Sequence, residues 1–140
     1  MGIVDLELSR TSETAAEHHR ELGDSGRDAA RTSLYVDYPY LIFYGLFLAG
    51  ACVVVGARGA ERGMAALPRA ARILAIGALV GAACDAVENA ALLRVLAGHV
   101  DQPWPGIAFG FAVAKFALTC AAAVFAVAGF LVTAARKRAA

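Results

Sequence analysis

The stretch GALVGAACDAVENAALLRVL, residues 77–96, decides the fold that we expect for this chain. It is the central part of an apolar run from about residue 70 to residue 98, and a few polar side chains interrupt it. Comparable apolar runs cover about residues 34–57 and 105–135. A helix needs about 20 apolar residues to cross the hydrocarbon core of a bilayer, so each run is long enough to span it once. The sequence therefore predicts an all-α integral membrane bundle of three transmembrane helices.

The composition agrees with a membrane protein. Of the 140 residues, 59% are hydrophobic and 18% are charged, and the mean hydropathy is +0.60. Soluble domains contain about 45 to 50% apolar residues. The net charge of +1 leaves no concentrated basic face, which argues against nucleic acid as a partner. The chain has 11 arginines, 2 lysines and 33 alanines, a bias typical of a high-GC bacterial genome, so we expect the bacterial inner (plasma) membrane.

The apolar runs divide the chain into a polar N-terminal segment (1–33), a transmembrane domain (34–135) and a basic C-terminal tail (136–140). Short cytoplasmic flanks carry the excess of Lys and Arg in membrane proteins. The N-terminal segment has seven acids against four arginines, and the loop 99–104 has no Lys or Arg. We therefore predict an outside N-terminus and a cytoplasmic C-terminus. The basic residues of the cytoplasmic side would be Arg58, Arg62, Arg69, Arg72, Arg136, Lys137 and Arg138.

Short soluble or interfacial helices are expected before the first span. Ser12 and Ser25 are the candidate helix caps, Ser25 with Asp28 three residues on as in a capping box, and Gly23 separates the two segments. The second helix is expected to continue into the first span. Pro39 then either starts the transmembrane helix or kinks the helix that began at Ser25, and we expect the kink.

Polar residues lie within the second and third spans, where hydrocarbon surrounds a transmembrane helix. Asp85, Glu88 and Asn89 fall within an arc of about 100° on a helix. Lys115 and Thr119 belong to a stripe of small residues on the third span, and such stripes let membrane helices approach closely. We expect the two faces to pack together. The glycine pairs Gly77 and Gly81, and Gly106 and Gly110, match the same small-residue spacing.

The depth of these residues predicts one ion pair. Glu88 and Lys115 are each about ten residues from the loop that joins the second and third spans, which puts both about 15 Å below the outer boundary. We expect these two side chains to pair, because an unpaired charge at such depth costs at least about 2.5 to 3.5 kcal/mol. This pairing leaves Asp85 without an obvious cation. We expect Asp85 to be protonated at neutral pH or hydrogen-bonded to Thr119.

Two further charged residues are expected at the membrane interface. Asp37 is near the outer end of the first span. Arg94 points almost opposite the Asp85 face, so it either extends to the lipid headgroups or reaches another subunit.

The polar cluster of Asp85, Glu88, Asn89, Lys115 and Thr119 leaves several functions open. Three roles are consistent with these residues: a structural contact between helices, a docking site for a membrane partner, or part of an ion or proton pathway. The leading hypothesis is a small polytopic membrane protein of non-enzymatic type, an accessory subunit or interaction module within a homo-oligomer or larger membrane complex. The alternative is an oligomeric ion- or proton-coupled transporter or channel. A lipid-modifying membrane enzyme is the third hypothesis.

No catalytic residue, cofactor or metal site is predicted. The three cysteines lie in different apolar runs and form no ligand pattern. His18 and His19 are neighbours that point about 100° apart on a helix, with no third ligand in view. Haem ligation within the membrane usually uses His or Met at depth, and neither is present in the spans.

Two resemblances accompany these predictions. The run CDAVENAALLRVL (84–96) with its D-x-x-E-N core, the lysine of the next span and the run GRDAARTSLYVDYPYLIFYG (26–45) resemble uncharacterised small bacterial membrane proteins. That resemblance covers residues 10–135 and implies a membrane fold, with no assigned activity. The architecture is distantly similar to bacterial diacylglycerol kinase, which also has three spans with acidic and amide residues in the second. This chain departs from that family in the spacing of those residues and lacks its lysine-aspartate pair at the start of the third span.

Overall fold

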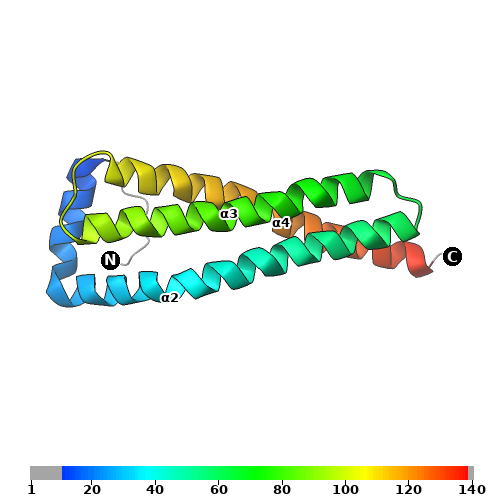
Figure 1. The fold of residues 1–140 in the computed structure, drawn as a ribbon, viewed down its shortest axis with the longest axis horizontal. Coiled ribbons are helices and arrows are strands. Elements are labelled where there is room, and N and C mark those ends of the chain that lie inside the picture. The colour runs from blue at the N-terminus through cyan, green and yellow to red at the C-terminus, as the bar shows by residue number, and fades with distance from the viewer. Residues whose placement is uncertain (1–10, 139–140) are drawn as a thin grey trace. The chain divides into compact units, whose positions relative to one another are not determined.

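The computed structural model describes the backbone of residues 11–138 and the side chains of residues 11–135. The described chain forms three helices and no strand (Figure 1). They are α2 (Ser12–Glu61), α3 (Ala66–Leu96) and α4 (Trp104–Arg138). The predicted all-α class is confirmed for these residues. Residues 1–10 of the predicted N-terminal segment and the side chains of the basic tail lie outside the described part.

All three helices are long and apolar enough to cross a membrane. The most apolar 18-residue windows have mean hydropathies of 2.1 in α2, 1.7 in α3 and 2.2 in α4. The prediction of three membrane-length helices is therefore confirmed, and the chain is consistent with a multi-pass membrane protein. The first connection is shorter than predicted, because α2 continues to Glu61 and α3 begins at Ala66. The second connection lies close to its predicted place, because α3 ends at Leu96 and α4 begins at Trp104.

A break at Gly23 divides α2 into two helical segments. Gly23 has φ 61° and ψ −179°, a conformation that only glycine adopts readily. Arg27 spans the break: its guanidinium donates to the carbonyl oxygen of His19 at 3.0 Å and pairs with the carboxylate of Asp24. At Pro39 the helix continues, so the residue with non-helical torsion angles in α2 is Gly23 and not the proline.

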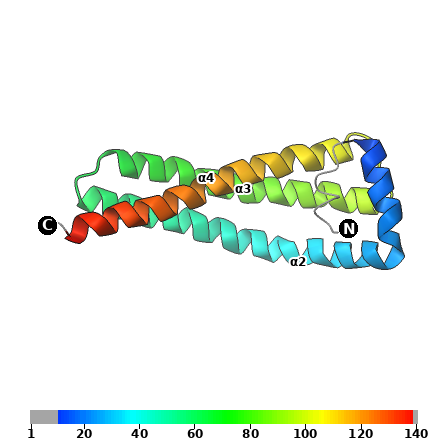
Figure 2. The same ribbon diagram turned by 180° about the vertical axis from the view of Figure 1, so that it is seen from behind.

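The segment of α2 before Gly23 begins at a capping box. The Thr14 backbone N–H donates to the Thr11 hydroxyl at 3.3 Å, and the Thr11 N–H donates to the Thr14 hydroxyl at 3.4 Å. The predicted cap at Ser12 is therefore one residue too late. Figure 2 shows this segment beside the end of α3 and the start of α4. Ala15 is fully buried there, in one apolar cluster with Leu96 and Ala108.

The chain forms two compact units, and each helix contributes to both. The first unit combines the chain up to Leu41 with Ala83–Lys115, and the second combines Ile42–Ala82 with the chain from Phe116. The first unit has an apolar core around Leu34, Leu92 and Val95. The second has a smaller core of Cys52, Ala75, Ala78 and Ala122.

Glycine and alanine hold the helices of the second unit in close contact. A Cβ atom added to Gly56 would lie 2.7 Å from the Cβ of Ala71, and one added to Gly45 would lie 2.7 Å from the Cβ of Ala82. Such contacts let helix backbones approach closely. The predicted pair Gly106 and Gly110 does not serve this purpose, because a Cβ on Gly110 would meet nothing within 4 Å.

Candidate functional site

The polar residues of the first unit gather around Lys115. Its Nζ lies 2.8 Å from Oδ1 of Asp85 and 2.9 Å from Oε2 of Glu88. The two acids are three residues apart on α3 and therefore lie on the same face of that helix. The Lys115 side chain is 12% exposed, Asp85 6% and Glu88 0%. One ammonium group of α4 thus bridges two buried carboxylates of α3.

This arrangement follows from the cost of burying charge. Each charged side chain at depth in the bilayer costs several kcal/mol unless it is paired or hydrogen-bonded. Lysine suits the position because its ammonium group has three donors on a flexible stem, so it can contact two acceptors at once. Ala112 of α4 is fully buried and contributes no bulk near the lysine. The α3–α4 contact is therefore fixed by charge pairing as well as by close packing.

A second polar contact joins α3 to α2. Nδ2 of Asn89 donates to Oδ2 of Asp37 at 2.7 Å, and Asn89 is only 2% exposed. One residue further along α2, the hydroxyl of Tyr38 donates to the backbone carbonyl oxygen of Ala86 at 3.3 Å. Both contacts lie in the first unit, one turn of α3 or less from the carboxylates that pair with Lys115. Side chains of all three helices therefore take part in one polar region.

The predicted pair of Glu88 with Lys115 is present, and one related prediction is wrong. We expected Asp85 to lack a cation, but Lys115 contacts it at 2.8 Å. The sequence analysis paired the Lys115 ammonium group with one carboxylate and did not consider that it could contact two. Thr119 donates to the carbonyl oxygen of Phe116 on its own helix at 3.4 Å. Whether Asp85 is protonated stays a prediction.

Asp37 and Arg94 both have partners that the sequence analysis missed. Asp37 accepts the hydrogen bond of Asn89, so it belongs to the polar region, and its position at the membrane interface stays a prediction. Arg94 is exposed, and its guanidinium lies 5.6 Å from the centre of the Trp104 ring. A cation–π contact of this kind is worth about 0.5 to 1 kcal/mol at an exposed site. Residue spacing alone does not pair Trp104 with Arg94.

The site contains more carboxyl groups than cationic groups. Three carboxyl groups, those of Asp37, Asp85 and Glu88, meet one ammonium group and one amide. Among the described residues, no group of three or more His, Cys, Asp or Glu side chains is placed to hold a metal ion. The arrangement joins α2 and α4 to α3 through polar and charged side chains.

Comparison of the chain with family models, curated proteins and solved structures finds no match. The resemblances described from the sequence therefore stay predictions. The site is defined by its own geometry.

Proposed function

We propose that this chain is a non-enzymatic membrane protein that acts as an accessory subunit or interaction module. The observation that carries the proposal is the bridge from Lys115 to Asp85 and Glu88 within one chain. Because Lys115 contacts both carboxylates inside the chain, the two acids do not depend on a partner for a cation. The cluster then serves to fix the order and register of three helices, and other surfaces are left for association.

Apolar side chains supply such surfaces. Phe43 and Phe47 on α2 are 72% and 73% exposed, and Val124 and Leu131 on α4 are 68% and 67% exposed. In a bilayer these side chains face lipid or the helices of a partner. A homo-oligomer or a larger membrane complex would cover part of them.

Co-purification from native membranes in mild detergent tests this proposal. We would compare the wild type with Lys115→Met, and with the pair Phe43→Ala and Phe47→Ala, by mass spectrometry and native mass. A distinct partner should remain with any Lys115→Met protein that accumulates, and it should be depleted in the phenylalanine variant. Loss of the partner in Lys115→Met alone, at normal accumulation, would instead make the cluster a docking site. Recovery of the chain with no other membrane protein would contradict the subunit proposal.

The excess of carboxyl groups supports a second candidate, an oligomeric proton- or ion-coupled transporter or channel. When every group is ionised, Asp37, Asp85 and Glu88 carry three negative charges against one positive charge on Lys115. Such an excess inside a membrane protein favours uptake of a proton or a cation. Proton flux into proteoliposomes should then fall to background in Glu88→Gln and persist in Glu61→Gln, which changes an exposed glutamate at the end of α2. Absence of flux in the wild type would reject this candidate.

We also propose the bacterial inner membrane, with the N-terminus outside and the C-terminus in the cytoplasm. The arginines Arg58, Arg62, Arg69 and Arg72 belong to one compact unit, which holds the end of α2 and the start of α3. This gathering of positive charge agrees with a cytoplasmic flank.

Cysteine labelling in a background without the three natural cysteines tests the orientation. An impermeant maleimide should label Ser12→Cys in intact cells and should label Ala65→Cys, in the α2–α3 turn, only after permeabilisation. The reverse pattern would overturn the orientation.

A further inference from the structure

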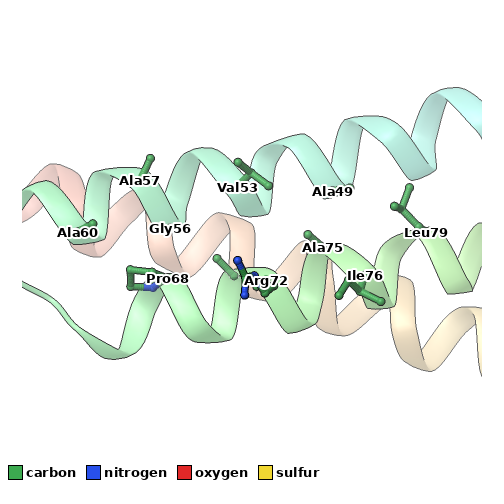
Figure 3. Close-up of a pocket in the computed structure, with 11 residues that line it drawn as sticks. Ala49, Val53, Gly56, Ala57, Ala60, Pro68, Arg72, Ala75, Ile76 and Leu79 are labelled. Atoms are coloured by element: carbon green, nitrogen blue, oxygen red, sulfur yellow. The ribbon is translucent and has the colours of Figure 1, made fainter.

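A groove in the second unit lies between α2 and α3 and has a volume of about 520 Å³ (Figure 3). Its lining is almost wholly apolar and includes Ala49, Val53 and Gly56 on α2 and Pro68, Ala75 and Leu79 on α3. Arg72 is the one charged residue among the lining side chains. The groove is separate in sequence and in structural unit from the polar region around Lys115.

The groove arises from the sizes of neighbouring side chains. Gly56 and Ala71 keep α2 and α3 in contact, since a Cβ on the glycine would lie 2.7 Å from that of the alanine. Ala57 and Ala60 leave the adjoining surface open because they are small. Val53, which is 58% exposed, adds an apolar side chain to the same lining. The result is a groove that is suited to a narrow apolar ligand.

The length of the groove matches one leaflet of a bilayer. Its lining on α2 runs from Ala49 to Ala60, which at about 1.5 Å per residue is about 16 Å. Half of the hydrocarbon core of a bilayer is about 15 Å thick. Ala60 is close to the α2–α3 turn and Ala49 is further along the helix towards its middle. An acyl chain that enters from the end near the turn would therefore fill the groove within a single leaflet.

The charge at the groove indicates an anionic headgroup. Arg72 is exposed and lies about 9 Å along α3 from the helix start at Ala66, so its long side chain can extend towards the membrane surface. The first N–H groups of α3 add partial positive charge at the same end. Arg58, on the neighbouring helix, has its guanidinium 4.8 Å from the centre of the Phe130 ring. Guanidinium groups bind phosphate through paired hydrogen bonds, and basic pockets between transmembrane helices bind anionic headgroups.

We propose that this groove is a binding site for an anionic phospholipid, with one acyl chain between α2 and α3 and the phosphate held by Arg72. The apolar lining supplies contact area, and the single arginine supplies the preference for an anionic lipid. The site acts independently of the polar cluster and of the proposed subunit function.

Native mass spectrometry of the delipidated full chain in detergent tests the proposal, with phosphatidylglycerol and phosphatidylcholine as the added lipids. Phosphatidylglycerol should bind the wild type more tightly. Arg72→Gln should weaken its binding about fivefold, a factor that corresponds to about 1 kcal/mol. Arg69→Gln is the matched control, because it removes a neighbouring exposed arginine that does not line the groove. It should leave the affinity for phosphatidylglycerol within twofold of wild type.

A second pair of variants tests the acyl-chain contact. Ala57→Phe fills the groove from an exposed lining position and should weaken both lipids, whereas Val54→Phe adds the same ring outside the lining and should weaken neither. An experiment on the wild type alone tests the proposal even if the variants fail to fold. Phosphatidylglycerol with a photoreactive acyl chain should label peptides that contain Val53 or Ile76.

Three results would overturn the lipid site. The first is equal affinity for the two lipids, and the second is equal loss in Arg72→Gln and Arg69→Gln, which would reflect general surface charge. The third is displacement of the bound lipid by inorganic phosphate, which would show that the guanidinium alone, and not the groove, holds the ligand.

Discussion

Removal of the ammonium group from the polar cluster gives the most direct test of how α3 and α4 are held together. In Lys115→Met the methionine keeps an unbranched apolar stem, but Asp85 and Glu88 lose the group that lies 2.8 and 2.9 Å from their oxygen atoms. Breaking a buried ion pair by removing one partner costs about 3 to 5 kcal/mol, because the remaining charge stays buried. Because both carboxylates are 6% exposed or less, we expect the free energy of unfolding to fall by an amount within that range.

Unfolding of the purified protein in detergent, followed by its helical circular dichroism, measures this loss. A triple variant with Asp85→Asn, Glu88→Gln and Lys115→Met removes all three charges while it keeps the shapes of the acidic side chains. It should recover most of the stability, because neutral replacement of a whole buried pair is often nearly neutral. Arg94→Met is the matched control: it removes an exposed cation and should cost about 0.5 to 1 kcal/mol. The reasoning is refuted if Lys115→Met costs less than the control, or if the triple variant is no more stable than Lys115→Met.

Other contacts make smaller and separable contributions, each measured by the same unfolding experiment. Asn89→Ala removes the donor 2.7 Å from Asp37 and should cost about 1 to 3 kcal/mol, whereas Asp37→Asn retains an acceptor oxygen and should cost less. Gly56→Val overpacks the α2–α3 contact and should cost about 1 to 3 kcal/mol, while Gly50→Ala meets open space and should be neutral or stabilising. Gly23→Ala should cost about 1 to 3 kcal/mol and speed amide exchange in residues 12–22, because φ is 61° there. Equal effects at positions 50 and 56 would contradict the packing argument.

The helices and much of the polar cluster follow from local features of the sequence. Three apolar runs of sufficient length are enough to predict three membrane-length helices, because helices satisfy their own backbone hydrogen bonds in lipid. The positions of Asp85 and Glu88 on one helical face, and the similar depth of Lys115, follow from helix geometry and a short loop. The angular position and the depth of a residue on a straight helix depend only on residue counts.

Contacts that depend on the rotation of one helix about its axis do not follow from such counts. The hydrogen bond between Asp37 and Asn89 requires a particular face of α2 to meet α3, and 52 residues separate the two. The same limit applies to Gly56, whose close approach to α3 depends on which face is turned inwards. The break at Gly23 was placed correctly between two helices. At Pro39 the sequence left a helix start or a kink, and the helix does not start there because α2 runs through the proline.

The polar cluster and the apolar groove should respond independently to mutation, and this independence separates stability from binding. Lys115 belongs to the first compact unit and Arg72 to the second, and the contacts described for the two residues share no partner. Mutations at sites without shared partners usually add within about 0.3 to 0.5 kcal/mol. Arg72→Gln should therefore lower lipid affinity with little effect on unfolding in lipid-free detergent. Lys115→Met should lower stability but leave the lipid affinity of the remaining folded protein within twofold of wild type. If Lys115→Met weakened lipid binding as much as Arg72→Gln did, the groove would depend on the charge bridge, and the two regions would have to be treated as one site.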